Sequence, residues 1–164
     1  MQGYRETEES LKGFIFVCFV MLGLRADFAA AQSSNIIAKN GLWKTECTYN
    51  QIMKRRECDV TFEFNQPGAQ FIAGKIFVNL IKKEVNVFAA DSPTAFKLAV
   101  DQGKAVPAKC SAGCTIDGAA GAALFQQMLK GKSFSFSLTT GGKTSLDHSD
   151  SLAGFAECVA AAGK

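Results

Sequence analysis

The stretch Phe96–Cys114, FKLAVDQGKAVPAKCSAGC, decides the fold that this sequence predicts. Apolar side chains at Phe96, Leu98 and Val100 alternate with other residues, which is typical of a strand with one buried face. The sequence Asp-Gln-Gly at 101–103 then predicts a tight turn, in which the glycine would take a positive φ. The stretch therefore predicts antiparallel β structure.

Beyond the turn, a return strand carrying Pro107 leads into a cysteine loop. Cys110 and Cys114 are close enough in sequence for a disulfide to close a five-residue loop. A second pair, Cys47 and Cys58, would close a loop of twelve residues between two further strand-like segments. Each bridge is expected to contribute roughly 2–3 kcal/mol to stability.

The rest of the chain repeats the β pattern, with two short exceptions near its end. Period-2 alternation and turn signals predict strands over residues 41–49, 57–65, 71–81, 85–89, 133–138 and 143–148. Apolar stripes at helical spacing predict helices over 119–130 and 152–162. Many short strands with frequent turns are typical of a β-sandwich. The expected fold is mainly β, an immunoglobulin-like β-sandwich with two short α-helices, formed by a single domain over residues 41–164.

The start of the chain resembles a targeting segment. An uninterrupted apolar run, Gly13–Leu24, is followed by small residues at Ala29–Ala31, which predicts a signal peptide over residues 1–31. Twelve residues span only about 18 Å as a helix, short of the ~30 Å hydrocarbon core of a bilayer. We therefore expect no stable transmembrane span after signal removal, and a mobile N-terminal arm over residues 32–40.

Charge and cysteine content limit the compartment and the partners. The chain carries a formal net charge of +3, well short of the concentrated basic face of a nucleic-acid-binding protein. Paired cysteines in an exported chain favour persistent disulfides, so the expected location is periplasmic or secreted. Cys158 is left over; it either pairs between chains or lies buried as a small apolar side chain.

The order of these features resembles the invasion-associated locus B family of secreted alphaproteobacterial proteins. The matching motifs are G-x-W-x-x-x-C, a later cysteine, LAVDQGKAVP, C-x-x-G-C, L-K-G and S-L-x-G-F, at 41–47, 58, 98–107, 110–114, 129–131 and 151–155. This covers nearly all of the chain after the signal segment. The resemblance implies a periplasmic or secreted immunoglobulin-like sandwich linked to host-cell invasion. It implies no enzymatic activity and supplies no catalytic residues.

The residues themselves offer few candidates for chemistry. Cys110 and Cys114 could form a thiol-disulfide redox pair, although such pairs mostly have two intervening residues at a helix N-terminus. His148 is the only histidine and cannot form a catalytic triad with its sequence neighbours, because adjacent strand residues point to opposite faces. One histidine and bridged cysteines also leave a zinc site without ligands. Gly141–Thr144 lacks the first glycine of a phosphate-binding loop and predicts a hairpin turn instead. We expect no catalytic residues, no cofactor and no metal.

The most plausible binding feature is a run of three cations, Lys54, Arg55 and Arg56, at the tip of the first hairpin. They could contact lipopolysaccharide, another anionic lipid or a glycan, or they could form an ordinary solvated turn. The sequence thus predicts an exported, disulfide-stapled, non-catalytic protein of the cell envelope associated with host-cell invasion or host interaction. The alternatives are a thiol-disulfide redox protein and an anionic-ligand binding module. The expected partner is an unidentified envelope or host-surface protein, or an anionic surface.

Overall fold

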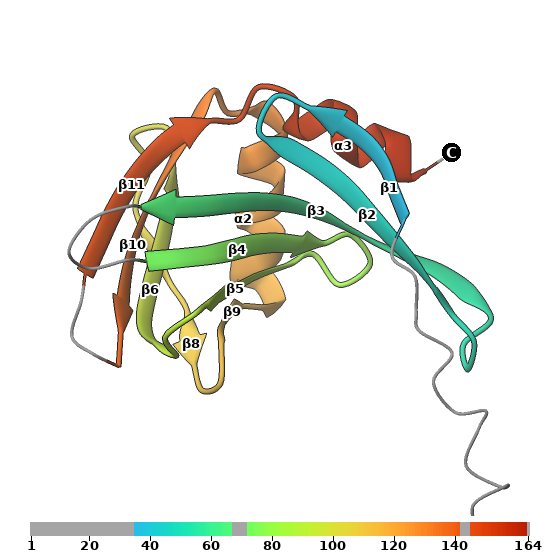
Figure 1. Ribbon diagram of the computed structural model, residues 1–164. Coiled ribbons are helices and arrows are strands. Elements are labelled where there is room, and N and C mark those ends of the chain that lie inside the picture. Colours follow the sequence, from blue (N-terminus) through green and yellow to red (C-terminus); the bar gives the residue numbers. More distant parts are fainter. Residues whose placement is uncertain (1–34, 67–71, 142–144, 164) are drawn as a thin grey trace, which may run out of the picture. The chain divides into compact units, whose positions relative to one another are not determined.

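The computed structural model describes residues 35–66, 72–141 and 145–163 (Figure 1). The predicted signal peptide over residues 1–31 lies outside the described residues. So do residues 142–144, within the segment for which a hairpin turn is predicted.

The described chain is built from two antiparallel sheets and two helices. The larger sheet has the order β1-β2-β3-β4-β5-β9-β8, with β1 Asn35–Asn40, β2 Trp43–Asn50, β3 Arg55–Gln66, β4 Ile72–Asn79, β5 Glu84–Ala89, β9 Cys114–Ile116 and β8 Lys109–Cys110. The smaller sheet has the order β11-β10-β6-β7, with β11 Ser145–Ser151, β10 Ser133–Thr140, β6 Pro93–Val100 and β7 Val106–Pro107. The helices are α2, Gly118–Lys130, and α3, Phe155–Ala162. The mainly β fold with two short helices is thus confirmed, and β1 to β5 follow one another as a meander.

Trp43 lies at the centre of the core, where both sheets and a helix meet. It is completely buried, and its ring lies 4.9–5.4 Å from the rings of Phe62 on β3, Phe134 on β10 and Phe155 on α3. Its indole N–H donates a hydrogen bond to the carbonyl oxygen of Ser151, at 3.0 Å. Because these partners come from distant parts of the chain, the Trp43 side chain joins the larger sheet, the smaller sheet and α3.

The two helices pack against different strands. Helix α2 buries Leu124, Phe125 and Met128 and contacts β5 and β6, whereas α3 contacts β1, β2 and β3. In Figure 1, α3 accordingly lies next to β1 and β2. Each helix buries one stripe of apolar side chains, as their spacing predicts.

The last helix starts three residues later than the sequence predicts. Leu152 is buried but precedes α3, and the N-cap residue is Gly154, whose φ is +91°. A Cβ atom on Gly154 would lie 2.3 Å from the carbonyl oxygen of Asn40. The close approach of these two backbones therefore sets where α3 begins. Because Asn40 and Gly154 are distant in sequence, no local sequence pattern could predict this contact.

Two further predictions differ from the structure. We expected residues 32–40 to form a mobile arm, but Asn35–Asn40 is β1, which reverses at Gly41 (φ +59°) and pairs with β2. In the predicted turn after β6, the residue with positive φ is Asp101 (+51°) and not Gly103. Asp101 is held there because its carboxylate accepts hydrogen bonds from the backbone N–H groups of Lys132 and Ser133, both at 3.0 Å. These bonds lower the pKa of Asp101.

Candidate functional site

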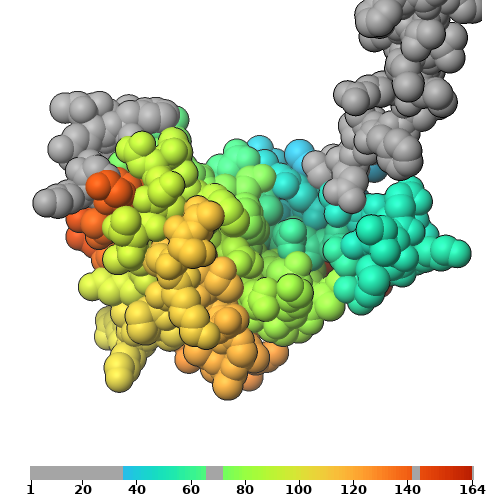
Figure 2. Space-filling view, turned by 90° about the horizontal axis from the view of Figure 1, so that it is seen from below, coloured from blue at the N-terminus to red at the C-terminus, as the bar shows by residue number. Residues whose placement is uncertain are grey.

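The hairpin formed by β2 and β3 reaches beyond the strands on either side of it. The described part of β1 pairs with β2 only as far as Cys47, and β4 pairs with β3 only from Asp59 onward. Pairing between β2 and β3 continues outward from Cys47 and Cys58 to Asn50 and Arg55. Within the described residues, the end of this hairpin is a two-stranded ribbon, which projects at the lower right of Figure 1 and at the right of Figure 2.

A disulfide closes the ribbon at its base. Cys47 and Cys58 lie directly opposite each other, with their Cα atoms 4.1 Å apart, and both side chains are buried. A two-stranded hairpin is marginally stable by itself in water, since it has no third strand or core against which to pack. The disulfide therefore anchors the ribbon where the support of the sheet ends.

The turn at the end of the ribbon is ordered by local hydrogen bonds. The side-chain oxygen of Asn50 accepts hydrogen bonds from the backbone N–H groups of Ile52, at 3.1 Å, and Met53, at 3.0 Å. Lys54 closes the turn with a φ of +49°. Asparagine favours such turns because its side chain can bond to the backbone two residues later. The local sequence thus fixes the conformation of this turn.

The three predicted cations lie together on this ribbon, and all are exposed. Arg55 is bonded to Glu57, with 2.9 Å between Nε and Oε1. This hydrogen bond lowers the pKa of Glu57. Among the described residues, neither Lys54 nor Arg56 forms an ion pair. The end of the ribbon therefore keeps an excess of positive charge.

Sequence reasoning missed the apolar half of this site. Ile52 is 91% exposed, Met53 56% and Tyr49 51%. The signal was present in the sequence, because NQIMKRR places two large apolar residues in a turn that otherwise consists of polar residues. We name Tyr49, Ile52, Met53, Lys54, Arg55 and Arg56 together the hairpin tip. Its composition is amphipathic, because it combines three exposed apolar side chains with three cations.

A second turn of similar character lies near the base of the hairpin. It connects β4 to β5, and its Leu80 N–H donates a hydrogen bond to the carbonyl oxygen of Cys58. Ile81 is exposed in this turn, and Lys82 adds a further exposed cation. Since β2–β3 and β4–β5 are successive hairpins of one antiparallel meander, both turns lie at the same end of the larger sheet.

The second predicted cysteine pair also forms a disulfide. Cys110 and Cys114 are directly opposite each other on β8 and β9, with Cα atoms 4.0 Å apart. Cys114 is 1% exposed, and the nearest following helix, α2, begins only at Gly118. Neither cysteine therefore occupies the helix N-terminus that lowers the pKa of a reactive thiol. This arrangement is typical of a structural bridge.

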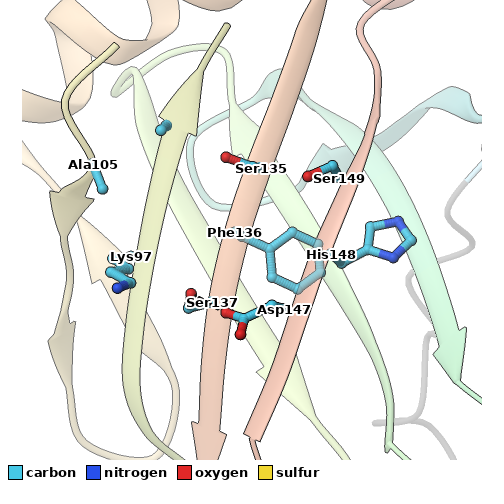
Figure 3. A pocket seen from close by; sticks show the side chains of 9 residues that line it. Lys97, Ala105, Ser135, Phe136, Ser137, Asp147, His148 and Ser149 are labelled. Carbon is cyan, nitrogen blue, oxygen red and sulfur yellow. Dashed lines mark hydrogen bonds between the residues drawn. The ribbon is translucent and has the colours of Figure 1, made fainter. Parts of the chain in front are cut away.

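The outer face of the smaller sheet forms a shallow hollow of about 270 Å³ (Figure 3). Most of its lining side chains are short, because serines and alanines face outward from β6, β10 and β11. Ser137 donates a hydrogen bond to the carboxylate of Asp147 on the neighbouring strand, and Lys97 lies opposite Ser137 on β6. The hollow can therefore hydrogen-bond a polar molecule through Ser137, Asp147 and Lys97.

His148 belongs to the other face of the same strand. Its ring packs 5.3 Å from the ring of Phe136 and 5.8 Å from that of Phe62, and its Nε2 lies 3.3 Å from Oδ2 of Asp150. Its sequence neighbour Asp147 instead bonds across the outer face of the sheet. The local His–Asp–Ser cluster is thus divided between two faces, as strand geometry predicts.

The described residues contain no cluster of metal ligands and no membrane-spanning helix. In residues 35–66, 72–141 and 145–163, no group of three or more histidine, cysteine, aspartate or glutamate side chains is placed to hold a metal ion. The helices within these ranges are too short or too polar to cross a membrane. The exposed apolar side chains and cations of the hairpin tip make it the strongest candidate for a functional surface on the described chain.

Comparison with known proteins gives one similar solved structure. No family model matches the sequence. No curated protein matches it either. The crystal structure of invasion associated protein B from Bartonella henselae is similar, with a TM-score of 0.48 and 18% sequence identity over 78% of this chain and 96% of that chain. That protein bears the name of the family that the sequence motifs resemble.

Proposed function

We propose that this protein is an exported, disulfide-stapled protein of the cell envelope that acts by surface contact and without catalysis. The observation that carries the proposal is the hairpin tip, an amphipathic end of a ribbon that projects past its sheet and is anchored by the Cys47–Cys58 bridge. The contacts expected of such a surface are with anionic groups, since Lys54 and Arg56 have no ion-pair partner among the described residues.

Two further features support export. Both cysteine pairs are bridged, and disulfides form and persist mainly in oxidising compartments such as the periplasm and the cell exterior. The apolar run Gly13–Leu24 and the small residues at Ala29–Ala31 are typical of a signal peptide. A role in host-cell invasion is proposed from the resemblance of the sequence motifs alone.

Binding to heparin, a soluble polyanion, tests the contact surface. The triple variant Lys54→Gln, Arg55→Gln, Arg56→Gln should elute from a heparin column at clearly lower salt than the natural chain. The matched control replaces three other exposed cations by glutamine, Lys39, Lys97 and Lys104, and therefore has the same net charge. Equal elution of the two triple variants would refute a specific role of the tip.

Export has a separate test. Protein from the periplasmic or culture fraction should migrate differently with and without reductant, and alkylation should find no free thiol at Cys47, Cys58, Cys110 or Cys114. Free thiols at all four positions would contradict the proposal.

The thiol-redox alternative lacks a supporting observation in the structure, because Cys114 is buried and neither cysteine lies at a helix N-terminus. An insulin-reduction assay tests it directly. Activity that disappears in Cys110→Ser would replace the proposal with that alternative.

A further inference from the structure

We propose that the hairpin tip docks on anionic phospholipid bilayers by inserting Ile52 and Met53 among the headgroups, while Lys54, Arg55 and Arg56 contact the lipid phosphates. This inference rests on the proposed function, because it names the partner of the same surface.

The exposure of the two apolar residues is the first argument. Ile52 is 91% exposed and Met53 56%, at the end of a ribbon that has no third strand beside it in the described chain. The transfer of large apolar side chains out of water normally lowers the free energy. Here the fold holds them in water, with the turn fixed by the Asn50 side chain. A binding partner would therefore find both side chains already in position.

The distribution of charge is the second argument. Lys54, Arg55 and Arg56 follow the apolar pair directly. Glu57 is the only carboxylate in residues 48–57. Glu57 is already bonded to Arg55. Apolar residues flanked by lysine and arginine are typical of segments that lie at a bilayer interface, where cations attract anionic headgroups and apolar side chains enter the boundary with the acyl chains.

The shape of the tip favours a bilayer over a folded protein. Ile52 and Met53 lie in the turn at the end of the ribbon, which projects at the right of Figure 2. A narrow convex end inserts readily into a deformable headgroup layer, whereas a rigid protein partner would need a matching pocket. The β4–β5 turn, with exposed Ile81 and the cation Lys82, lies at the same end of the sheet but near the base of the hairpin, so the tip projects beyond it.

The proposal can be tested with vesicles of phosphatidylcholine alone and of phosphatidylcholine containing one quarter phosphatidylglycerol. The variant Ile52→Ser, Met53→Ser should bind the anionic vesicles about tenfold or more weakly than the natural chain. It should bind heparin normally, since its cations remain. The control Ile36→Ser, Leu42→Ser removes two other exposed apolar side chains, 60% and 54% exposed, and should leave vesicle binding unchanged.

Charge removal should act on both ligands. The triple glutamine variant at 54–56 should lose on the order of a hundredfold in binding to the anionic vesicles, because each cation near an anionic surface contributes about fivefold. Phosphatidylcholine vesicles should bind the natural chain much more weakly than the anionic vesicles do.

Insertion itself needs a readout at the tip, because vesicle binding alone does not show which residues enter the bilayer. A tryptophan introduced by Met53→Trp should shift to shorter emission wavelength on anionic vesicles and be quenched by brominated acyl chains. Phe88→Trp, at a position 48% exposed on the outer face of β5, should remain unquenched. The natural Trp43 is fully buried and supplies a constant background.

The outcomes separate the two proposals. Heparin binding that depends on the three cations, combined with no quenching at residue 53 and no effect of the double serine variant, would overturn bilayer insertion and leave the proposed contact function standing. If the triple glutamine variant binds both heparin and the anionic vesicles as well as the natural chain does, both proposals are overturned. Quenching at residue 53, with vesicle binding weakened by the double serine variant, is the expected result.

Discussion

Cys47 and Cys58 face each other at the point where the β2–β3 hairpin leaves the support of its sheet. Inside this pair, β3 is flanked by β4, and β2 is flanked by β1. Outside it, ten residues form a ribbon that pairs only with itself in the described chain. The position of this bridge therefore ties the stability of the fold to the order of the proposed contact surface.

Removal of this bridge should destabilise the protein and loosen the hairpin tip. We expect the variant Cys47→Ala, Cys58→Ala to lose about 3 kcal/mol of unfolding free energy, the value for a closed loop of about twelve residues. Urea unfolding measures this loss, and hydrogen exchange should show earlier exchange of the amides at 48–57. The comparison variant Cys110→Ala, Cys114→Ala closes a shorter loop and should lose about 2 kcal/mol. Equal exchange at 48–57 in both variants would contradict the anchoring role.

The backbone contact between Gly154 and Asn40 should make position 154 intolerant of any side chain. Gly154→Ala places a Cβ atom 2.3 Å from the Asn40 carbonyl oxygen, at a φ of +91°. We expect a loss of about 2 kcal/mol or more in a denaturant titration. Gly118→Ala is the matched control, because Gly118 also has a positive φ (+58°) but its Cβ would meet nothing within 4 Å. Its loss should be limited to about 1 kcal/mol of backbone strain. Similar losses in the two variants would show that the contact is unimportant.

Cys158 should be unreactive in the folded protein. It is a free cysteine on α3, and its side chain is completely buried. Its backbone carbonyl also accepts a hydrogen bond from the hydroxyl of Thr45, at 2.7 Å. Alkylation followed by peptide mapping should label Cys158 only after unfolding in denaturant. Rapid labelling under native conditions, or a dimer that dissociates with reductant and is lost in Cys158→Ala, would contradict this burial.

An ion-pair cluster on the outer face of the larger sheet should make stability depend on pH. Glu46 lies 2.9 Å from Lys44 and 3.0 Å from Lys75. Burial by itself raises the pKa of Glu46, but the hydrogen bonds from both lysines outweigh it and lower the pKa below 4.5. A carboxyl group with a lowered pKa stabilises the folded state above its unfolded pKa, and this contribution is lost as the pH falls through the folded pKa.

The variant Glu46→Gln should therefore be about 1 kcal/mol less stable than the natural chain at pH 7. The difference should shrink as the pH falls below about 4.5. Chemical unfolding at pH 3 to 7 measures it. Asp59 provides a contrast, because burial raises its pKa and its ionisation disfavours the folded state. Asp59→Asn should retain the hydrogen bond to Asn79. Its unfolding free energy, compared with that of the natural chain, should be more favourable at pH 7 than at pH 3. A pH-independent difference for Glu46→Gln would refute the assigned role of the cluster.

The outward face of the larger sheet shows how neighbours can override a local pattern. Alternation along β3 predicts Thr61 on the solvent side, and the residue does lie on the face opposite Val60 and Phe62. It is nevertheless 1% exposed, because it pairs with Lys44 and Phe77 on the flanking strands. Strand periodicity gives the face on which a side chain lies, whereas its burial depends on the size of residues from other strands.

The sequence by itself determined the features that neighbouring residues encode. The alternation around Phe96–Val100, the two cysteine pairs and the cations at 54–56 are all contained in short stretches, because strand periodicity and turn propensity act over a few residues. Only the tertiary structure decided the strand order, the burial of Thr61, the start of α3 at the Gly154–Asn40 contact, and the length of hairpin that extends past β1 and β4. These features depend on pairing register between distant segments, which is set by how the sheet faces pack and not by any local pattern.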